Sequence, residues 1–193
     1  MRLIESDSDR LLAALRILLA EKNIATVPEV AERIRLTDAA SPAQGARMVA
    51  RAWTDPEYRA RLLADGTRAA EEMGIPMRGA PPLGVLEDTA DTHHLVVCTL
   101  CSCYPRAVLG YPPFWFKSAA YRAKAVRDPR GTLAEWGTVL PAGMRVRVVD
   151  STADYRWMVL PRRPDGTETW SAERLAALVG AEEMVGVRLP QLR

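Results

Sequence analysis

The chain has 193 residues, 48% of them hydrophobic, and a formal net charge of +2 at pH 7. It is long enough to bury a sizeable core, and its nearly balanced charge gives no reason to expect nucleic acid or a membrane surface as a partner. The sequence has neither an apolar run of transmembrane length nor the pattern of a signal peptide. We therefore expect a cytoplasmic protein.

Residues 1–78 are predicted to form a helical arm. Five leucines between Leu11 and Leu19 share one face at helical spacing. The segment Ser41-Pro42-Ala43-Gln44 has a capping-box pattern with proline at the first helical position. Asp55-Pro56-Glu57 predicts a further helix start, and Gly74 its end. No cluster of reactive side chains occurs here, so we expect this arm to make subunit contacts.

Residues 79–193 are predicted to form a second domain, after the break Arg-Gly-Ala-Pro-Pro at residues 78–82. Short apolar runs predict strands at residues 83–86, 95–97, 144–149 and 157–160. Helical patterns cover residues 115–126, 132–136 and 171–179. The predicted fold class is therefore α+β: a helical N-terminal arm followed by a layered α/β domain that binds a metal and carries the catalytic site.

All three cysteines lie in one hexapeptide, Cys98-Thr99-Leu100-Cys101-Ser102-Cys103, which we term the cysteine loop. An odd number in one tight cluster is not a disulfide framework. A structural zinc site normally has four ligands, an iron–sulfur cluster usually has four cysteines, and a redox pair would leave one cysteine unexplained. His93 and His94 precede the loop and could offer a fourth ligand, although a histidine pair on a strand is more often structural.

The spacing also suits one octahedral ion. If Cys101 and Cys103 bind it, the backbone nitrogens of Ser102 and Cys103 lie between the two sulfurs and could complete a planar set of four donors. Cys98 could then bind from below, which leaves the sixth position open for water or substrate. Deprotonated amides require a strongly Lewis-acidic, trivalent metal.

Such a site carries excess negative charge and needs basic groups or hydrogen-bond donors around it. Arg122 and Arg127 are candidates from this chain, although arginines on an exposed helix face are usually only solvated. Glu87 is a further candidate neighbour of the site, about as readily a surface carboxylate.

The segment from Val97 to Cys103 resembles the signature loop of the nitrile hydratase α subunit. The resemblance covers most of residues 83–190, and the arm fits more loosely. It is carried by these further segments: His93–Val97, Leu109–Pro113, Lys117-Ser118, Tyr121-Arg122, Arg127–Arg130, Met158–Pro161 and Arg163–Thr167.

The resemblance implies one Co(III) per chain, with Fe(III) as the less favoured metal. Cys98 would be the axial thiolate, Cys101 a sulfinate and Cys103 a sulfenate, which are known oxidation products of low-pKa thiolates. The metal ligands would be these three residues and Ser102, and the catalytic residues Cys101, Ser102 and Cys103. Thr99 favours the cobalt type, as does Tyr104 after the third cysteine.

The implied activity is the hydration of a nitrile to its amide by Lewis-acid catalysis. The sequence leaves open whether activated water or the Cys103 sulfenate attacks the nitrile carbon. The implied partners are one or more β-type subunits, whose arginines would bond the oxidised cysteines, and an activator protein that inserts the metal.

Four positions depart from the family pattern: Asp88, His94, Arg106 and Tyr111. None is an expected metal ligand, but Arg106 and Tyr111 lie close to the loop in sequence and could alter the substrate pocket. The related γ subunit of thiocyanate hydrolase therefore stays an alternative, as does a hydratase for a bulky nitrile such as toyocamycin. A metal-storing or metal-delivering protein and a zinc-structured binding module are alternatives from other classes.

Overall fold

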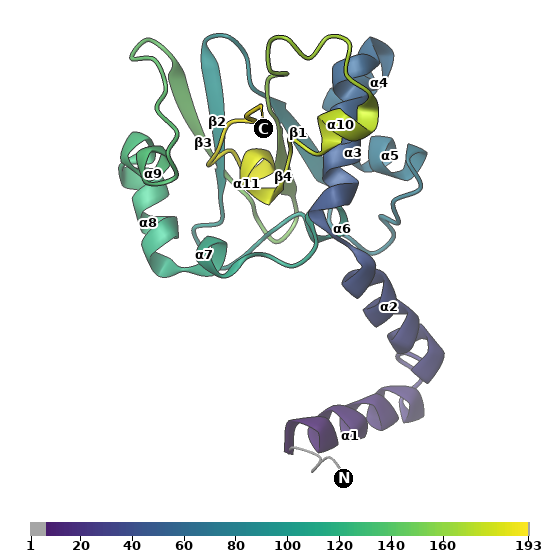
Figure 1. Cartoon of the computed structure of the whole chain (residues 1–193). Coiled ribbons are helices and arrows are strands. Elements are labelled where there is room, and N and C mark those ends of the chain that lie inside the picture. The colour runs from purple at the N-terminus through teal and green to yellow at the C-terminus, as the bar shows by residue number, and fades with distance from the viewer. Residues whose placement is uncertain (1–6, 193) are drawn as a thin grey trace, which may run out of the picture. The chain divides into compact units, whose positions relative to one another are not determined.

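The computed structural model describes residues 7–192, and these fall into two compact units that divide between Ala39 and Ala40 (Figure 1). The predicted boundary after residue 78 is therefore not where the chain divides. The reason is that residues 42–72 are packed into the core of the second unit rather than forming part of an arm.

The first unit consists of α1 (Asp7–Glu21) and α2 (Val27–Ala39). The leucine pattern between Leu11 and Leu19 thus lies on a helix, as predicted. Thr26 and Glu29 cap the start of α2, because the backbone N–H of each donates to the side chain of the other. Neither helix contains a buried residue, and Leu11 is 72% exposed.

The second unit begins with α3 (Pro42–Thr54), α4 (Pro56–Ala64) and α5 (Gly66–Glu72). At the predicted start of α3, the Gln44 side chain accepts a hydrogen bond from the Ser41 N–H at 3.2 Å. The single helix predicted from residue 55 to Gly74 is broken at Asp65. This residue ends α4 through its N–H and caps α5, since its carboxylate accepts from the Arg68 N–H.

Four strands form two parallel pairs, in agreement with the four predicted strands. Strand β1 (Leu83–Glu87) pairs with β4 (Arg156–Leu160), and β2 (Thr92–Val97) pairs with β3 (Arg145–Asp150). The last residue of β2, Val97, lies opposite Asp150, the last residue of β3. Whatever follows β2 therefore starts beside the carboxyl end of β3.

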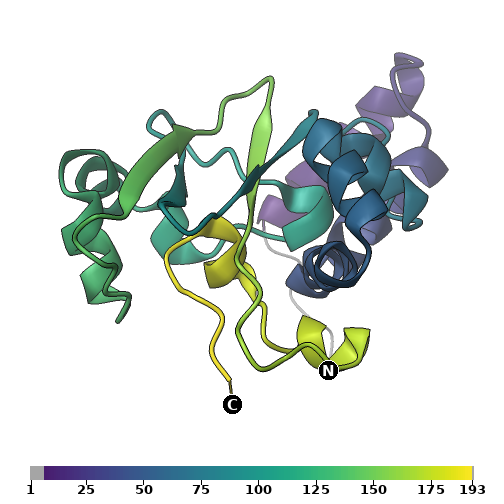
Figure 2. The same ribbon diagram turned by 90° about the horizontal axis from the view of Figure 1, so that it is seen from above.

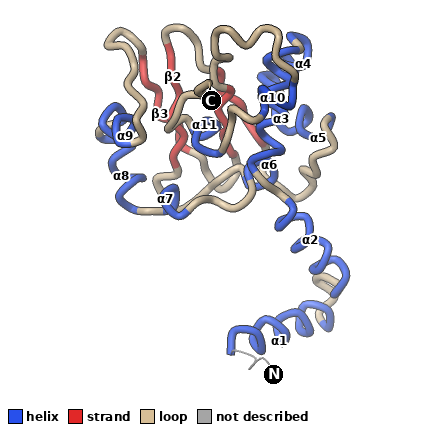
Figure 3. The backbone as a smooth tube through the Cα atoms, viewed as in Figure 1, coloured by secondary structure: helices blue, strands red, loops and turns tan. Residues whose placement is uncertain are grey.

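The remaining helices are short and flank the strands (Figures 2 and 3). They are α6 (Arg106–Leu109), α7 (Phe114–Lys117), α8 (Ala119–Arg127), α9 (Pro129–Glu135), α10 (Ala172–Ala176) and α11 (Ala181–Val185). The helix predicted at residues 115–126 is divided at Ser118, whose side chain caps α8 by accepting from the Tyr121 N–H at 3.1 Å. Helix α11 contacts both β2 and β4 and so joins the two strand pairs.

The core of the second unit combines residues from α3, both strand pairs and the short helices. Its largest fully buried side chains include Met48, Tyr58, Leu62, Tyr104, Phe116 and Met158. Arrangement and composition agree with the predicted α+β class. In the part of the chain from residue 7 to 192, no helix has the length and apolar character needed to cross a membrane.

Candidate metal centre

The cysteine loop follows β2 directly, and this strand fixes its depth in the molecule. The last five residues of β2 are buried, and burial continues into Cys98, which is 1% exposed. Cys103 is 7% exposed, whereas Cys101 between them lies at the surface. The loop is therefore anchored in the core at both ends and open to the outside at its middle.

The three sulfurs converge on one point. Cys101 Sγ lies 3.6 Å from Cys98 Sγ and 3.2 Å from Cys103 Sγ, and all three sulfurs lie within 4.8 Å of one another. The Cys101 N–H donates to Cys98 Sγ at 3.3 Å, which closes a tight turn at the start of the loop. Such a cluster could hold a metal ion, and residues 7–192 contain no other comparable group of His, Cys, Asp and Glu side chains.

The two outer thiols of the Cys-x-Cys segment differ in electrostatic environment. Burial raises the pKa of the Cys103 thiol to about 12, and its contacts with Cys101 and Cys98 act in the same direction. Hydrogen bonds from the Cys103 thiol and the Ser102 N–H lower the pKa of Cys101. In the metal-free chain, Cys101 therefore ionises before Cys103.

Thr99 is held by two neighbouring elements. Its N–H donates to Asp150 Oδ1 at 3.0 Å and its hydroxyl to Asp150 Oδ2 at 2.5 Å, from the end of β3. Its carbonyl accepts from Arg122 Nη1 at 3.1 Å, from α8. Of the two predicted basic groups, Arg122 thus contacts the loop, whereas Arg127 is exposed at the end of α8.

Residues next to the loop carry buried donors that have no hydrogen-bond partner. These atoms are Tyr104 Oη, Arg122 Nε and Arg156 Nη1. Tyr104 follows Cys103, Arg122 bonds Thr99, and the positive charge of Arg156 acts on the Cys103 thiol. An unpaired buried donor is costly. An anionic, metal-loaded loop would reduce that cost, so the residues present fit a metal with several anionic ligands.

His93 and His94 do not join the cysteines. Asp88 lies between them, with Oδ2 at 2.9 Å from His93 Nδ1 and Oδ1 at 3.1 Å from His94 Nδ1. The Nε2 atom of His93 lies 2.7 Å from the Gly186 carbonyl oxygen. All three side chains are buried, and the histidines sit near the start of β2 whereas the cysteine loop follows its end. A role as metal ligands is therefore not supported.

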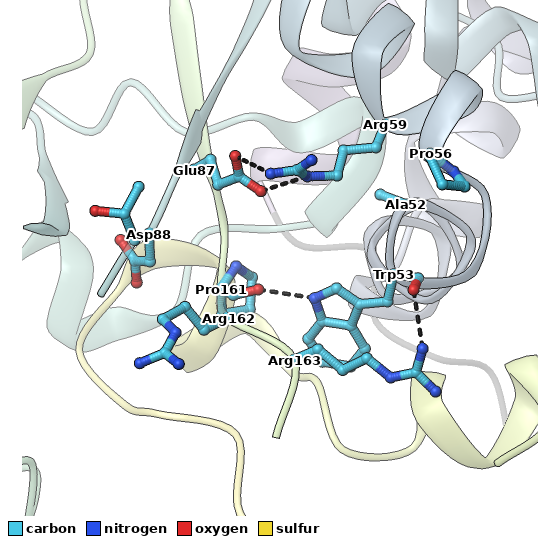
Figure 4. Close-up of a pocket in the computed structure, with 10 residues that line it drawn as sticks. Ala52, Trp53, Pro56, Arg59, Glu87, Asp88, Pro161, Arg162 and Arg163 are labelled. Atoms are coloured by element: carbon cyan, nitrogen blue, oxygen red, sulfur yellow. Dashed lines mark hydrogen bonds and ion pairs between the residues drawn. The ribbon is translucent and has the colours of Figure 1, made fainter. Parts of the chain in front are cut away.

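Glu87 lines a pocket that is separate from the cysteines. This pocket of about 420 Å³ lies at the carboxyl ends of β1 and β4 (Figure 4). There Glu87 forms a two-point ion pair with Arg59 at 2.5 and 2.6 Å. On another wall, Trp53 Nε1 donates to the Pro161 carbonyl at 2.8 Å. The Glu87 carboxylate thus holds α4 against β1 and contacts no residue of the cysteine loop.

Sequence reasoning missed Asp150, which contacts the cysteine loop most closely. An isolated aspartate at the end of an apolar run gave no signal, since it is distant from the loop in sequence. Asp88 was noticed only as a departure from a family pattern. Both carboxylates are recognisable only from the pairing of strands and the positions of loops.

Comparison with known proteins agrees with this geometry. The family model "Nitrile hydratase, alpha chain" matches residues 6–188. The chain belongs to the nitrile hydratase alpha-chain family. The predicted resemblance is therefore confirmed over nearly the whole chain, including the N-terminal helices that fitted more loosely.

Relatives within this family include both cobalt enzymes and a thiocyanate hydrolase subunit. A nitrile hydratase alpha subunit of Rhodococcus sp is 47% identical over 176 residues, 90% of this chain and 88% of the relative. The low-molecular weight cobalt-containing enzyme of Rhodococcus rhodochrous is 52% identical over 77% of this chain and 72% of its own alpha subunit. The thiocyanate hydrolase gamma subunit of Thiobacillus thioparus is 39% identical over 96% of this chain and 81% of its own.

Solved structures share the nitrile hydratase alpha-chain fold with this protein. A recombinant thiocyanate hydrolase with partially modified cobalt centres superposes with a TM-score of 0.87 at 38% identity, over 97% of this chain and 92% of that one. A double histidine-to-alanine mutant of the Fe-type nitrile hydratase of Comamonas testosteroni Ni1 gives 0.82 at 38% identity, over 96% and 92%. The family thus contains cobalt and iron members.

Proposed function

We propose that this chain is the metal-binding subunit of a nitrile hydratase, with one Co(III) held by its cysteine loop. The ligands are the sulfurs of Cys98, Cys101 and Cys103 and the backbone nitrogens of Ser102 and Cys103, with Cys101 as sulfinate and Cys103 as sulfenate. The observation that carries the proposal is the convergence of three sulfurs within 4.8 Å in a chain of this family. Cobalt is favoured over iron because several relatives at 43–52% identity are named cobalt-containing.

The residues of the loop divide the work between them. Bound Co(III) supplies Lewis-acid polarisation of the nitrile. Cys98, buried at the end of β2, fixes the centre relative to the core, while exposed Cys101 leaves the loop open on its outer side. Ser102, half-buried between the outer cysteines, orients the planar ligands through its backbone. The Cys103 sulfenate oxygen lies beside the open position and is a candidate nucleophile or base.

This centre requires a partner chain of the β type. The side chains of Leu100 and Phe114 are 86% and 85% exposed near the cysteine loop, which is unusual for large apolar groups in water. The exposed leucine face of α1 is a second uncovered apolar surface. A β-type subunit would cover these surfaces and supply further donors to the oxidised cysteines. An activator protein would insert the metal, because Co(III) exchanges ligands slowly.

A specific residue keeps thiocyanate hydrolysis as the second candidate function. Arg106 lies three residues after Cys103, and its guanidinium stacks 4.5 Å over the Tyr111 ring. Within residues 7–192 it has no acidic partner within salt-bridge distance. An unneutralised cation beside the centre would favour an anionic substrate such as thiocyanate over a neutral nitrile.

The test is co-expression with a β-type subunit, an activator protein and cobalt, followed by metal analysis and peptide mass spectrometry. We expect one cobalt per chain, two added oxygens on Cys101, one on Cys103, and turnover of small nitriles. Cys98→Ala serves as the control that abolishes cobalt retention. Zinc bound to three unmodified cysteines would overturn the proposal in favour of a zinc-structured module.

Substrate choice is tested on the same preparation. The values of kcat/KM are compared for acetonitrile, a bulky nucleoside nitrile such as toyocamycin, and thiocyanate, in the wild type and in Arg106→Gln. A preference for nitriles supports the first candidate. Turnover of thiocyanate alone that falls in Arg106→Gln would support the second. A cobalt-loaded complex without turnover of any of these would indicate a protein that stores or delivers metal.

A further inference from the structure

We propose that Asp150 and Arg122 form a clamp on Thr99 that holds the cysteine loop in its metal-binding conformation. We call these two residues and Thr99 the Thr99 clamp. The inference rests on the proposed function in that the loop binds a metal. It assigns Asp150 and Arg122 as positioning residues, which act on the centre through the loop backbone rather than by touching substrate.

The clamp engages every polar group of Thr99. The N–H and hydroxyl donate to the two separate oxygens of the Asp150 carboxylate, at 3.0 and 2.5 Å. The carbonyl accepts from Arg122 Nη1 at 3.1 Å. A residue whose donors and acceptor are all directed by fixed partners has little freedom to rotate, although its side chain is exposed at the surface.

Strand pairing places the carboxylate at this point. Asp150 is opposite Val97 in the register of β2 and β3, and the Ser151 N–H extends the ladder by donating to the Val97 carbonyl at 2.7 Å. The aspartate therefore follows the loop into its first residues from the neighbouring strand. Within residues 7–192, no lysine or arginine pairs with this carboxylate. Both of its oxygens are available for Thr99.

Helix α8 supplies the other half of the clamp. Its Tyr121 hydroxyl donates to the Val96 carbonyl at 2.7 Å, just before the loop, and the next residue, Arg122, bonds the Thr99 carbonyl. The helix therefore holds the chain on both sides of Cys98. Arg122 Nε is buried without a partner, so the same guanidinium also has a free donor and a positive charge close to an anionic loop.

The clamp matters because of what the loop must do. Three sulfurs separated by three and two residues can reach one ion only if the backbone turns sharply, and the 3.3 Å contact from the Cys101 N–H to Cys98 Sγ marks that turn. Thr99 lies inside the turn, so restraining it removes conformations in which the sulfurs diverge. Preorganisation of this kind raises affinity by reducing the ordering that binding requires.

The variant that tests the clamp is Thr99→Val, which keeps the shape and the backbone groups but removes the hydroxyl donor. Thr99→Ser, which keeps the donor, is its matched control. In the purified full-length chain without metal, cobalt(II) is titrated and followed by the thiolate-to-cobalt absorption band. We expect Thr99→Val to weaken cobalt(II) binding about tenfold, as the loss of one charge-assisted hydrogen bond implies, and Thr99→Ser to bind as the wild type does.

The two partners are tested in the same titration. Asp150→Asn cannot accept from both donors and should weaken cobalt(II) binding at least as much as Thr99→Val, while Asp154→Asn, an exposed aspartate near the end of β3, should not. Arg122→Gln should weaken binding and Arg127→Gln, on the same helix, should not. If the groups act through one contact, Thr99→Val combined with Asp150→Asn loses less than the sum of the two single variants.

A merely structural role predicts a different result. In that case, binding and the absorption band stay unchanged in Thr99→Val, or the losses in all variants follow their melting temperatures, and either result overturns the clamp. If Asp150→Asn fails to fold, Thr99→Val at the surface still decides. This readout needs neither oxidised cysteines nor turnover, so absence of nitrile hydration would overturn the proposed function and leave the clamp to be judged by cobalt(II) affinity.

Discussion

Asp88 is a buried carboxylate that lies between two buried histidines at the start of β2. Burial by itself opposes ionisation of Asp88, but hydrogen bonds from His93 and His94 hold the pKa of the carboxyl below its ordinary value of 3.8. Burial would likewise lower the pKa of His93, and the hydrogen bond and charge of Asp88 outweigh it, so that the pKa is raised above 6.5. The two groups therefore form an ion pair inside the second unit.

The pH dependence of stability follows from these directions. The Asp88 contribution is present above the ordinary aspartate pKa and lost as pH falls through the lowered one. The His93 contribution is complete below pH 6.5 and lost as pH rises through the raised pKa. The pair therefore stabilises most between the two ordinary values, in the mildly acidic range.

Asp88→Asn should lower the free energy of unfolding by about 3 kcal/mol in this range, because a buried charge loses its partner. The loss should shrink above the raised pKa of His93. The same substitution should bring the His93 pKa below 6.5, since burial is then unopposed. Urea unfolding at several pH values and NMR titration of the ring measure both effects. Asp91→Asn, an exposed neighbour, is the control, and an unmoved His93 pKa in Asp88→Asn would contradict the ion pair.

Gly186 is the second residue whose role is set by close contact with the histidines. Its φ is +87°, and a Cβ atom built there would lie 2.0 Å from the His94 carbonyl oxygen. Gly186→Ala should therefore cost about 3 kcal/mol, from backbone strain together with a steric clash. Gly137→Ala is the matched control, because its φ is +77° but no atom lies within 4 Å. Equal losses of unfolding free energy in the two variants would show that the close approach is unimportant.

At the scale of elements, polar caps decide where the helices of the second unit begin and end. Asp65 separates α4 from α5, although the sequence pattern continues as one helix, because its carboxylate accepts the Arg68 N–H at 3.0 Å. Ser118 divides α7 from α8 in the same way. The strands were easier to predict, since a short apolar run has few alternatives in a domain with buried parallel pairs.

Asp65→Ala should destabilise the second unit by about 1 kcal/mol, the usual cost of losing an N-cap. Asp65→Asn, which keeps an oxygen acceptor, should lose no more than a few tenths. Thermal unfolding of both variants measures the difference. If Asp65→Ala is as stable as the wild type, the break between α4 and α5 depends on tertiary packing rather than on the cap.

At the scale of the whole molecule, the two units have different burial. The residues of the hydrophobic core all lie at or beyond Ala46, whereas α1 and α2 contain no buried residue. The second unit therefore has its own core, while the first presents apolar side chains that nothing in the described chain covers. This difference is what a segment that binds another subunit would show.

Removal of residues 1–39 should leave the melting temperature of the second unit within about 2 °C of the full chain, because no core contact is lost. The truncated chain should no longer form a stable complex with the β-type subunit in size-exclusion chromatography. Leu11→Glu combined with Leu15→Glu tests the apolar face without truncation and should weaken the same complex. Undiminished assembly of both variants would refute the predicted subunit contacts.

The sequence by itself determined the features that depend on neighbouring residues. Three cysteines within six positions were sufficient to predict converging sulfurs, because the turn that joins them is local. Apolar runs similarly predicted the four strands. The N-terminal leucine pattern predicted a helix, but amphipathicity does not tell whether a helix packs on its own chain or on another, so α3 to α5 were assigned to the arm.

Only the tertiary structure decided which distant side chains reach the cysteine loop. Thr99 and Asp150 are 51 residues apart, and no local pattern connects them. They meet because β2 and β3 are parallel and end at the same level, which brings the start of the loop beside the last residue of β3. The positions of Arg122 on α8 and of Asp88 between the histidines likewise follow from packing, since long-range contacts are set by how elements assemble and not by residue type alone.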